Sequence, residues 1–427
     1  MVLCHKYLTD ILLLGGICMK RITIMKMMVY LFVLVIMLTA CSSKSPSETT
    51  MDSSKESSQE ESATSDSIES SETDDAEEPV DSQTVILKPY DDICRLFKRK
   101  TSGVVLEENQ FKPGDIYTYT FDNANIFKDS EDLACEILEN GKDPGLGIRN
   151  LHKQGITGKN VNVAIIDQNM LIDHPEFEGR IIDYYDSGCN EPENEGSYHG
   201  ASVTGILAGR TIGVAPEVNV YYAAAPSWER DAKYFADSLN WIIKKNKSLP
   251  KTEKIRVVSV SSAPTSEGDW YKNGELWEEA VLAAQKDGIM VIDCRSEKRD
   301  TCFVFSSYCC NLDDKDNVSK YKPGYPNDKE DYFTDEYWKD RLFAPASFRT
   351  LAQEFIVGEY NYRYEGVGGM SWAVPYVSGV LALGWQVNPE LDGETMKNLL
   401  FESSWVNDEG LHFINPPAFI EAVQSSH

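Results

Sequence analysis

Three polar residues stand where predicted secondary structure begins or ends. Asp167 closes the apolar run 162–167, His199 precedes a stretch of small residues, and Ser371 follows two glycines. A serine hydroxyl is a poor nucleophile at neutral pH, so a histidine must take its proton during attack. A carboxylate must fix the tautomer of that histidine and stabilise the imidazolium. Taken singly, Asp167 and Ser371 could be helix caps; together the three are candidates for a catalytic triad.

The elements that must position these residues alternate between strands and helices from Gly145 onward. Near-continuous apolar strands that alternate with helices indicate an α/β fold, with a mostly parallel sheet covered by helices on both faces. Chemistry in such folds collects beyond the carboxyl ends of the strands, where Asp167 stands. Strands are expected at 162–167, 218–223, 256–260 and 289–293, and helices at 200–208, 233–245, 276–286 and 371–387.

The predicted helix that begins at Ser371 has a chemical consequence. Its first backbone N–H groups and the positive end of its dipole would face an oxyanion that develops beside the serine. Gly368 and Gly369 permit a sharp turn and a close approach of substrate.

Three motifs in this order resemble those of the subtilisin-like serine peptidases, over roughly 145–425. That family has an Asp after a buried strand, a His-Gly pair that opens a helix, a Gly-Val-Ala-Pro turn, and a Gly-Thr-Ser-Met-Ala-x-Pro segment. The 32 residues between Asp167 and His199 also match the family. The resemblance implies that Asp167, His199 and Ser371 form the triad. The matching segments are VAIID (163–167), HGASVTGILAG (199–209), GVAP (213–216) and GGMSWAVP (368–375).

His174 is the rival general base. Its His-Pro pair matches a structural turn of the family and is not followed by a helix, so His199 is preferred.

The resemblance also implies a substrate bound as an extended strand between two protein segments. Their counterparts are Val260, Ser261, Ser262 and Ala263 in the first, and Ile292, Asp293, Cys294 and Arg295 in the second.

The chain departs from the family where an asparagine normally contributes to the oxyanion hole. The sequence after the strand is Asp293-Cys294-Arg295-Ser296-Glu297, without an asparagine. Ser296 is the candidate that could donate instead. Removal of one oxyanion donor costs a factor of about 10²–10³ in rate, so slow catalysis is one expectation.

The N-terminal residues resemble a secretory signal. Lys20, Arg21 and Lys26 precede the apolar run 27–38, and Leu38-Thr39-Ala40-Cys41 resembles a bacterial lipobox, with Cys41 as the lipidated residue. The alternative is an uncleaved transmembrane helix. Met19, followed by Lys-Arg, fits a start better than Met1.

Four regions follow from composition and pattern. Residues 1–41 form the signal with its lipobox, and 42–84 an acidic tether with 13 Asp or Glu against two Lys. Such a composition buries too little apolar surface to fold. Residues 85–145 are a small extension: an accessory subdomain, a belt on the main domain or a reduced propeptide. Within it, 85–88 and 114–121 read as strands and 130–139 as a helix. Residues 146–427 are the peptidase domain, with a surface insertion at about 297–340.

Charge and cysteine usage limit the partners. The net charge of −27 argues against a basic surface for nucleic acid, and we expect a monomer with a peptide or protein substrate and a membrane anchor at Cys41. Seven cysteines follow Cys41, an odd number, and free thiols are preferred over a Cys302–Cys309 or Cys302–Cys310 disulfide. No cofactor or metal site is predicted, and no loop is specific enough to assign calcium.

The leading functional prediction is a serine endopeptidase at the extracellular face of the cell membrane. One alternative is a weak or inactive peptidase fold that binds peptides. Another is a protease dedicated to the maturation of one peptide.

Overall fold

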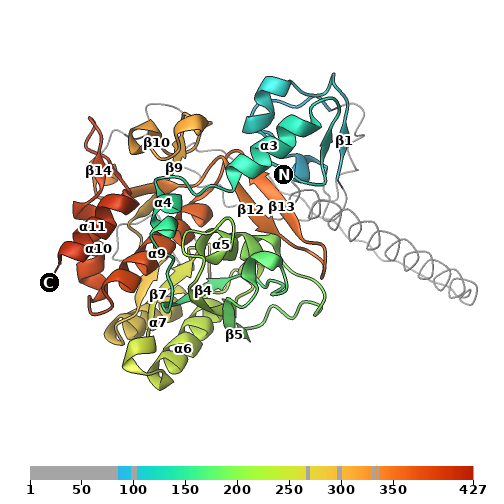
Figure 1. Ribbon diagram of the computed structural model, residues 1–427. Helices are drawn as coiled ribbons and strands as arrows, with labels where there is room; N and C mark the ends of the chain where they lie inside the picture. Colours follow the sequence, from blue (N-terminus) through green and yellow to red (C-terminus); the bar gives the residue numbers. More distant parts are fainter. Residues whose placement is uncertain are drawn as a thin grey trace, which may run out of the picture. The chain divides into compact units, whose positions relative to one another are not determined.

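A computed structural model describes residues 85–97, 103–265, 270–295, 301–328, 333 and 336–426, all within the compact unit Ser67–His427. Its centre is a five-stranded sheet in which every neighbouring pair is parallel (Figure 1). Three of the four predicted strands agree with this sheet within a residue or two, and the fourth is shorter than expected. The strands, in spatial order, are β5 (Ile181–Asp186), β6 (Asn219–Ala224), β4 (Asn162–Asp167), β7 (Ile255–Val260) and β8 (Met290–Ile292).

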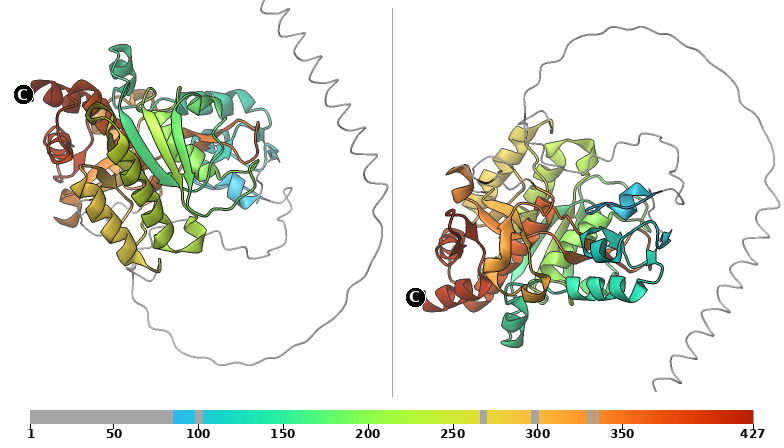
Figure 2. Two further views of the ribbon diagram at one scale, coloured as in Figure 1. Left: turned by 90° about the horizontal axis from the view of Figure 1, so that it is seen from below. Right: turned by 90° about the horizontal axis from the view of Figure 1, so that it is seen from above.

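Helices cover both faces of this sheet, as the pattern predicted (Figure 2). Successive side chains of a strand point to opposite faces. In β4, Val163 and Ile165 join the core under two helices, whereas Ala164 and Ile166 join the core under two others. By the same alternation, the side chain of Asp167 lies on the face of Val163 and Ile165. The first face packs against α5 (Tyr198–Ala208) and α9 (Met370–Val387), and the second against α6 (Ala232–Ser248) and α7 (Gly274–Lys286).

Smaller sheets surround the parallel sheet. One is five-stranded, in the order β10 (Tyr321–Pro323), β9 (Val304–Cys309), β11 (Leu342–Pro345), β15 (His412–Phe413) and β14 (Trp405–Val406). A second is antiparallel and contains β12 (Arg349–Gln353), β13 (Asn361–Glu365) and β2 (Phe121–Asp122). The third pairs β1 (Val105–Leu106) with β3 (Ile126–Phe127).

The remaining helices are short. The α-helices are α2 (Ile93–Leu96), α3 (Glu131–Gly141), α4 (Ile148–Lys153), α8 (Glu336–Lys339), α10 (Gly393–Glu402) and α11 (Pro416–Ser425). The 3₁₀ turns are η1 (Pro113–Thr118), η2 (Pro175–Phe177), η3 (Ser227–Glu229), η4 (Lys251–Glu253), η6 (Leu312–Asp314) and η7 (Val318–Lys320).

The extension 85–145 differs from the strands predicted within it. Residues 85–88 form no strand, and most of 114–121 is the 3₁₀ helix η1. Pro113 favours a helical start, and Ile116 and Tyr119 are buried in a local hydrophobic cluster without strand pairing. The predicted helix is present as α3. Strand β2 pairs with β13, so the extension shares a sheet with the peptidase domain.

The segment at about 297–340 also differs from a surface insertion. Its strand β9 is largely buried and lies between β10 and β11. The surface insertion was predicted from the clustered Asp, Lys, Pro and Tyr of the whole segment, which conceal this short buried strand.

The seven cysteines of the described residues form no disulfide with one another, in agreement with the preference for thiols over the Cys302–Cys309 and Cys302–Cys310 alternatives. None of the helices in the described part of the chain is long and apolar enough to cross a membrane. The predicted signal, Cys41 and the acidic tether lie outside the described residues.

Candidate active site

Asp167 and His199 form a close pair. Asp167 ends β4, and its Oδ1 lies 2.6 Å from His199 Nδ1. The Asp167 side chain is 2% exposed and that of His199 18% exposed, so the carboxylate is shielded while the imidazole reaches solvent. The backbone N–H of Gln168 donates to the same Oδ1 at 2.8 Å. This arrangement can hold the imidazole with Nδ1 protonated and leave Nε2 to act as a base.

Local contacts place His199 at the start of α5. The Ser197 hydroxyl caps the helix by accepting from His199 N–H at 3.1 Å. Gly200 follows because the helix approaches the loop after β4 closely: a Cβ there would lie 2.6 Å from the Gln168 carbonyl oxygen. Gln168 also accepts a hydrogen bond from Ser197. Gln168 was not predicted as a site residue, although Asp167-Gln168-Asn169 departs from the Asp-Thr/Ser-Gly of the family that the chain resembles.

Ser371 lies in the first turn of α9. Gly368 precedes it with a φ of +85°, and a Cβ there would lie 2.5 Å from the Ala346 carbonyl oxygen, so conformation and space both require glycine. The Ser371 hydroxyl donates to the Ser261 carbonyl at 3.4 Å, and the Ser261 hydroxyl donates to the Ser371 carbonyl at 2.8 Å. Ser371 is therefore tied to the carboxyl end of β7.

Trp372 connects the start of α9 to the start of α5. Its indole packs against the imidazole of His199, with ring centroids 5.0 Å apart and an interplanar angle of 36°. The structure thus brings the elements of Asp167, His199 and Ser371 together at the carboxyl ends of the parallel strands.

His174 has a structural environment. It is fully buried, its Nδ1 accepts from Glu176 N–H at 3.2 Å, and its Nε2 lies 3.2 Å from the Asn361 carbonyl oxygen. Burial lowers the pKa of His174 below its ordinary value. It caps η2 and makes no pair with Asp167, in agreement with the preference for His199.

The two expected substrate segments follow β7 and β8 and are bonded to each other. Cys294 N–H donates to the Ser262 carbonyl at 3.0 Å, which leaves no place for a peptide strand between these two residues. For the other residues of the two segments, the position of a substrate strand stays a prediction. Val260, Ser261, Ser262 and Ile292 are buried, whereas Ala263 and Cys294 are partly exposed.

The side chain of Asp293 points into the protein. It is fully buried, lies 2.8 Å from Arg295 Nε, and accepts from the Trp277 indole at 3.2 Å. Arg295 is 1% exposed and also contacts Glu278 and Thr301. Burial raises the pKa of Asp293, and the Arg295 guanidinium opposes that rise. Asp293 could reach a substrate only through its backbone.

We expect the loss of one partner of the Asp293–Arg295 ion pair to lower stability strongly. Removal of one partner of a buried ion pair costs about 3–5 kcal/mol because the other charge is left buried. We expect Arg295→Met to lower the free energy of unfolding by about that amount, measured by urea denaturation. The matched control is Lys251→Met, which breaks an exposed pair with Glu390 and should cost under about 1 kcal/mol. Equal losses in the two variants would contradict the prediction.

The hairpin of β12 and β13 supports the loop that leads into α5. Gly196 N–H donates to the Phe355 carbonyl at 2.9 Å, and Val357 N–H donates to the Asn194 carbonyl at 3.1 Å. Glu354, at the base of the hairpin tip, is fully buried. Its Oε1 accepts from Gly358 N–H at 3.0 Å, and its Oε2 has no partner among the described residues.

Burial raises the pKa of Glu354 from 4.5 to about 7. The folded state therefore resists ionisation, so stability should fall as pH rises from about 4.5 to about 7. One pKa unit corresponds to about 1.4 kcal/mol, so the loss is on the order of 3 kcal/mol. Glu354→Gln should remove most of this dependence and unfold at higher temperature than the parent at pH 8. If the melting temperatures of the two proteins change by the same amount between pH 5 and pH 8, the prediction is wrong.

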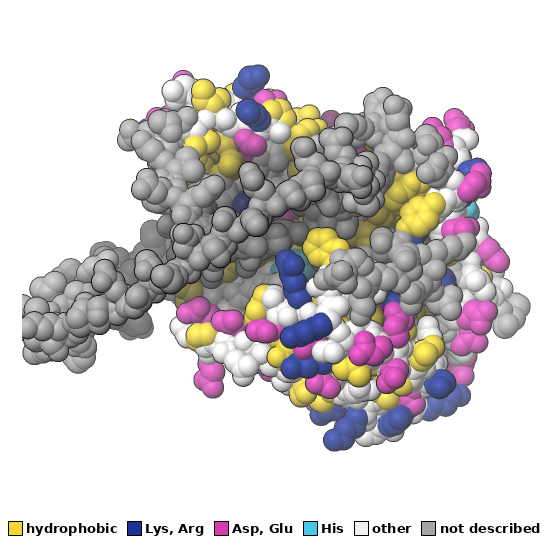
Figure 3. All heavy atoms as spheres, turned by 180° about the vertical axis from the view of Figure 1, so that it is seen from behind, with side chains coloured by type: hydrophobic (Ala, Val, Ile, Leu, Met, Phe, Trp, Pro, Cys, Tyr) yellow, Lys and Arg dark blue, Asp and Glu magenta, His cyan; other side chains and the backbone are white. Residues whose placement is uncertain are grey.

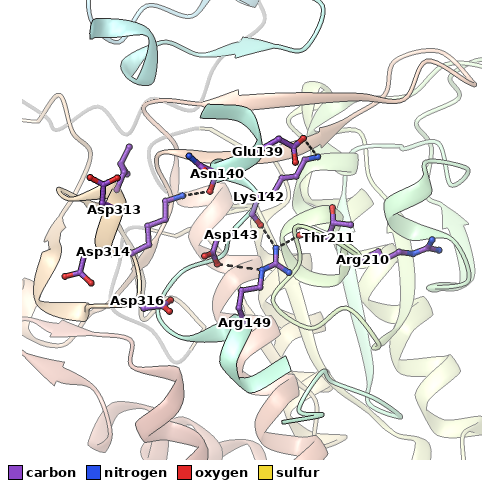
Figure 4. Close-up of a pocket in the computed structure, with 12 residues that line it drawn as sticks. Glu139, Asn140, Lys142, Asp143, Arg149, Arg210, Thr211, Asp313, Asp314 and Asp316 are labelled. Carbon is purple, nitrogen blue, oxygen red and sulfur yellow. Dashed lines mark hydrogen bonds and ion pairs between the residues drawn. The ribbon is translucent and has the colours of Figure 1, made fainter. Parts of the chain in front are cut away.

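One open cavity of the described residues lies elsewhere. It has a volume of about 820 Å³ and lies beyond the C-terminal end of α5, the end opposite to His199 (Figure 4). Acidic and basic side chains both line it, including Glu139, Lys142, Arg149 and Asp314. Charges of both signs are also interspersed on the face shown in Figure 3. Among the described residues, no cluster of His, Cys, Asp or Glu could hold a metal ion.

Comparisons with known proteins point to one family. Residues 158–328 match the model of the subtilase family. A subtilisin-like protease 2 of Arthroderma otae is 34% identical over 137 residues, which cover 32% of this chain and 30% of the relative. The subtilisin-like protease PopC of Myxococcus xanthus is 24% identical over 284 residues, 60% of this chain and 58% of PopC. The alignments thus span about a third to somewhat over half of these relatives.

Two solved structures are similar to this one. The prenylagaramide maturation protease PagA has a TM-score of 0.48 and 18% identity, covering 65% of this chain and 98% of PagA. Fervidolysin from Fervidobacterium pennivorans has a TM-score of 0.46 and 16% identity, covering 67% of this chain and 47% of fervidolysin. The match over 158–328 includes all five strands of the parallel sheet, so this part of the chain is similar to the subtilase family.

Proposed function

We propose that this protein is a serine endopeptidase that hydrolyses peptide bonds through Asp167, His199 and Ser371. The observation that carries the proposal is the 2.6 Å contact between Asp167 and His199, beside the helix start that bears Ser371. A peptide-binding protein would have no need of a buried carboxylate aligned on an imidazole.

The reaction follows from these groups. The Ser371 oxygen attacks the carbonyl carbon while His199 takes the hydroxyl proton, and the carbonyl electron pair moves onto oxygen. His199 then gives the proton to the leaving amine, and an acyl-enzyme remains on Ser371. Water, deprotonated by His199, hydrolyses this ester and restores the serine. The long 3.4 Å contact of the Ser371 hydroxyl suits a free enzyme, because catalytic hydrogen bonds often tighten only when substrate is bound.

The test combines a probe and a peptide library. A fluorophosphonate should label Ser371 in the folded protein, located by mass spectrometry of the digested adduct. The same preparation should cleave internal bonds in members of the library. Absence of both labelling and cleavage would overturn the proposal.

One observation favours a peptide-binding protein as the second candidate. The five residues after the strand, 293–297, contain no asparagine, so the family's side-chain oxyanion donor is missing. Peptide binding in equilibrium dialysis without turnover would support this candidate. The library also separates broad cleavage from the narrow preference of a dedicated maturation protease.

We further propose that the protein is exported and anchored through a lipid on Cys41. Support comes from the Leu-Thr-Ala-Cys sequence and from the acidic tract that follows it. Metabolic labelling with palmitate should mark the protein in membrane fractions, and Cys41→Ala should abolish the label. A labelled Cys41→Ala variant would contradict lipidation at this residue.

A further inference from the structure

The developing negative charge on the carbonyl oxygen needs hydrogen-bond donors beside Ser371. A pair of donors is typical of acyl transfer, and each is worth about 10²–10³ in rate. The backbone N–H of Ser371 can be the first donor, because the first N–H groups of a helix have no partner within it. A second donor, from the backbone or a side chain, must lie close to the same point.

Gly369, the N-cap of α9, marks an open space at this point. A Cβ on Gly369 would meet no other atom closer than 4.0 Å. The two atoms at that distance are the Ser371 backbone nitrogen and the Trp372 indole nitrogen. Two N–H groups therefore border the same small space, directly beside the serine.

The Trp372 indole N–H is available for a ligand. The side chain is only 5% exposed, yet the indole nitrogen has no hydrogen-bond partner among the described residues. The nitrogen is not among the fully buried side-chain atoms that lack a partner, so it faces accessible space and can donate to a ligand there. The other tryptophan of α9 behaves differently: the Trp385 indole donates to the Leu391 carbonyl at 3.0 Å.

We propose that the Trp372 indole N–H is the second donor of the oxyanion hole and so a catalytic residue of this protein. The inference rests on the proposed peptidase function and names the group that acts in place of the missing asparagine. In the transition state the carbonyl oxygen would accept from Ser371 N–H and from Trp372 Nε1–H. The same indole contacts the imidazole of His199, so one rigid side chain borders both the base and the oxyanion.

The decisive variants remove the N–H and keep the ring. Trp372→Phe retains an aromatic ring against His199, and replacement of Trp372 by benzothienylalanine retains the bicyclic shape with sulfur in place of N–H. Both should lower kcat for a cleaved library peptide by about 10²–10³ with little change in KM. Both variants should also raise the inhibition constant of a peptide aldehyde by a similar factor, because the adduct of the aldehyde carries the tetrahedral oxygen. Trp385→Phe is the matched control and should leave kcat within a fewfold of the parent.

The possible outcomes separate this inference from the proposed function. If the parent protein cleaves peptides and both Trp372 variants keep its kcat, the inference is overturned while the function stands. Loss of kcat in Trp372→Phe alone, with full activity of the benzothienylalanine protein, also overturns it, because shape rather than N–H then matters. A large loss in Ser296→Ala without a loss in the Trp372 variants would assign the donor to Ser296. Inactivity of the parent protein overturns the function and the inference together.

Discussion

Replacement of Ser371 by alanine is expected to lower kcat by about 10⁶, the largest effect that any single change should have on this protein. Without the hydroxyl no acyl-enzyme can form, and the hydrogen bond that Ser371 donates to Ser261 is lost as well. Stability should change little, because that bond is long. Progress curves with a cleaved library peptide, at enzyme concentrations high enough to detect residual turnover, measure the loss.

Ser378→Ala is the matched control in the same helix. The Ser378 hydroxyl is buried and donates to the Val374 carbonyl one turn earlier at 2.9 Å, so it has a structural role only. This variant should keep the kcat of the parent. A Ser371→Ala protein that retains more than about 1% of parental kcat would assign the nucleophile to another residue, because subtilase variants without the serine lose almost all turnover.

Four strands of the parallel sheet were predictable because they are largely buried on both faces, whereas β5 is partly exposed and was not predicted. The run from Asn162 to Ile166 is apolar after its first residue and too short for a helix, and the following Asp167 marks the carboxyl end of the strand. The starts of α5 and α9 were predictable from small residues and glycines that permit close packing. Gly200 and Gly368 show these close approaches in the structure.

Other features depended on partners that are distant in the sequence. Asp293 reads as a polar residue at a strand end, but Arg295 and Trp277 turn it inward. Strand β9 lies in a segment whose clustered Asp, Lys, Pro and Tyr indicate a surface insertion, and its pairing with β10 and β11 is what makes it a strand. Trp372 could not be recognised as a donor from sequence, because its contact with His199 joins two helices far apart in the chain.

Asp167→Ala is expected to lower kcat by about 10⁴, the second largest effect, by analogy with loss of the triad carboxylate in a subtilisin. The imidazole would lose the acceptor 2.6 Å from Nδ1 that orients it and stabilises its charged form. Asp173→Ala is the control: Asp173 is exposed and accepts only from the Tyr360 hydroxyl at 3.1 Å in the described structure, so kcat should not change. A kcat of Asp167→Ala within tenfold of the parent would exclude Asp167 from the triad.

Asp167→Asn separates the shape of the Asp167 side chain from its role as an acceptor. Oδ1 of Asp167 accepts from both His199 and Gln168 N–H. An asparagine keeps this shape, but its amide group can donate to Nδ1 of His199, which places the ring proton on Nε2 and removes the base. Asp167→Asn should therefore lower kcat by about 10⁴, as much as Asp167→Ala. A loss of less than tenfold in Asp167→Asn would mean that the tautomer and charge of His199 do not depend on the carboxylate.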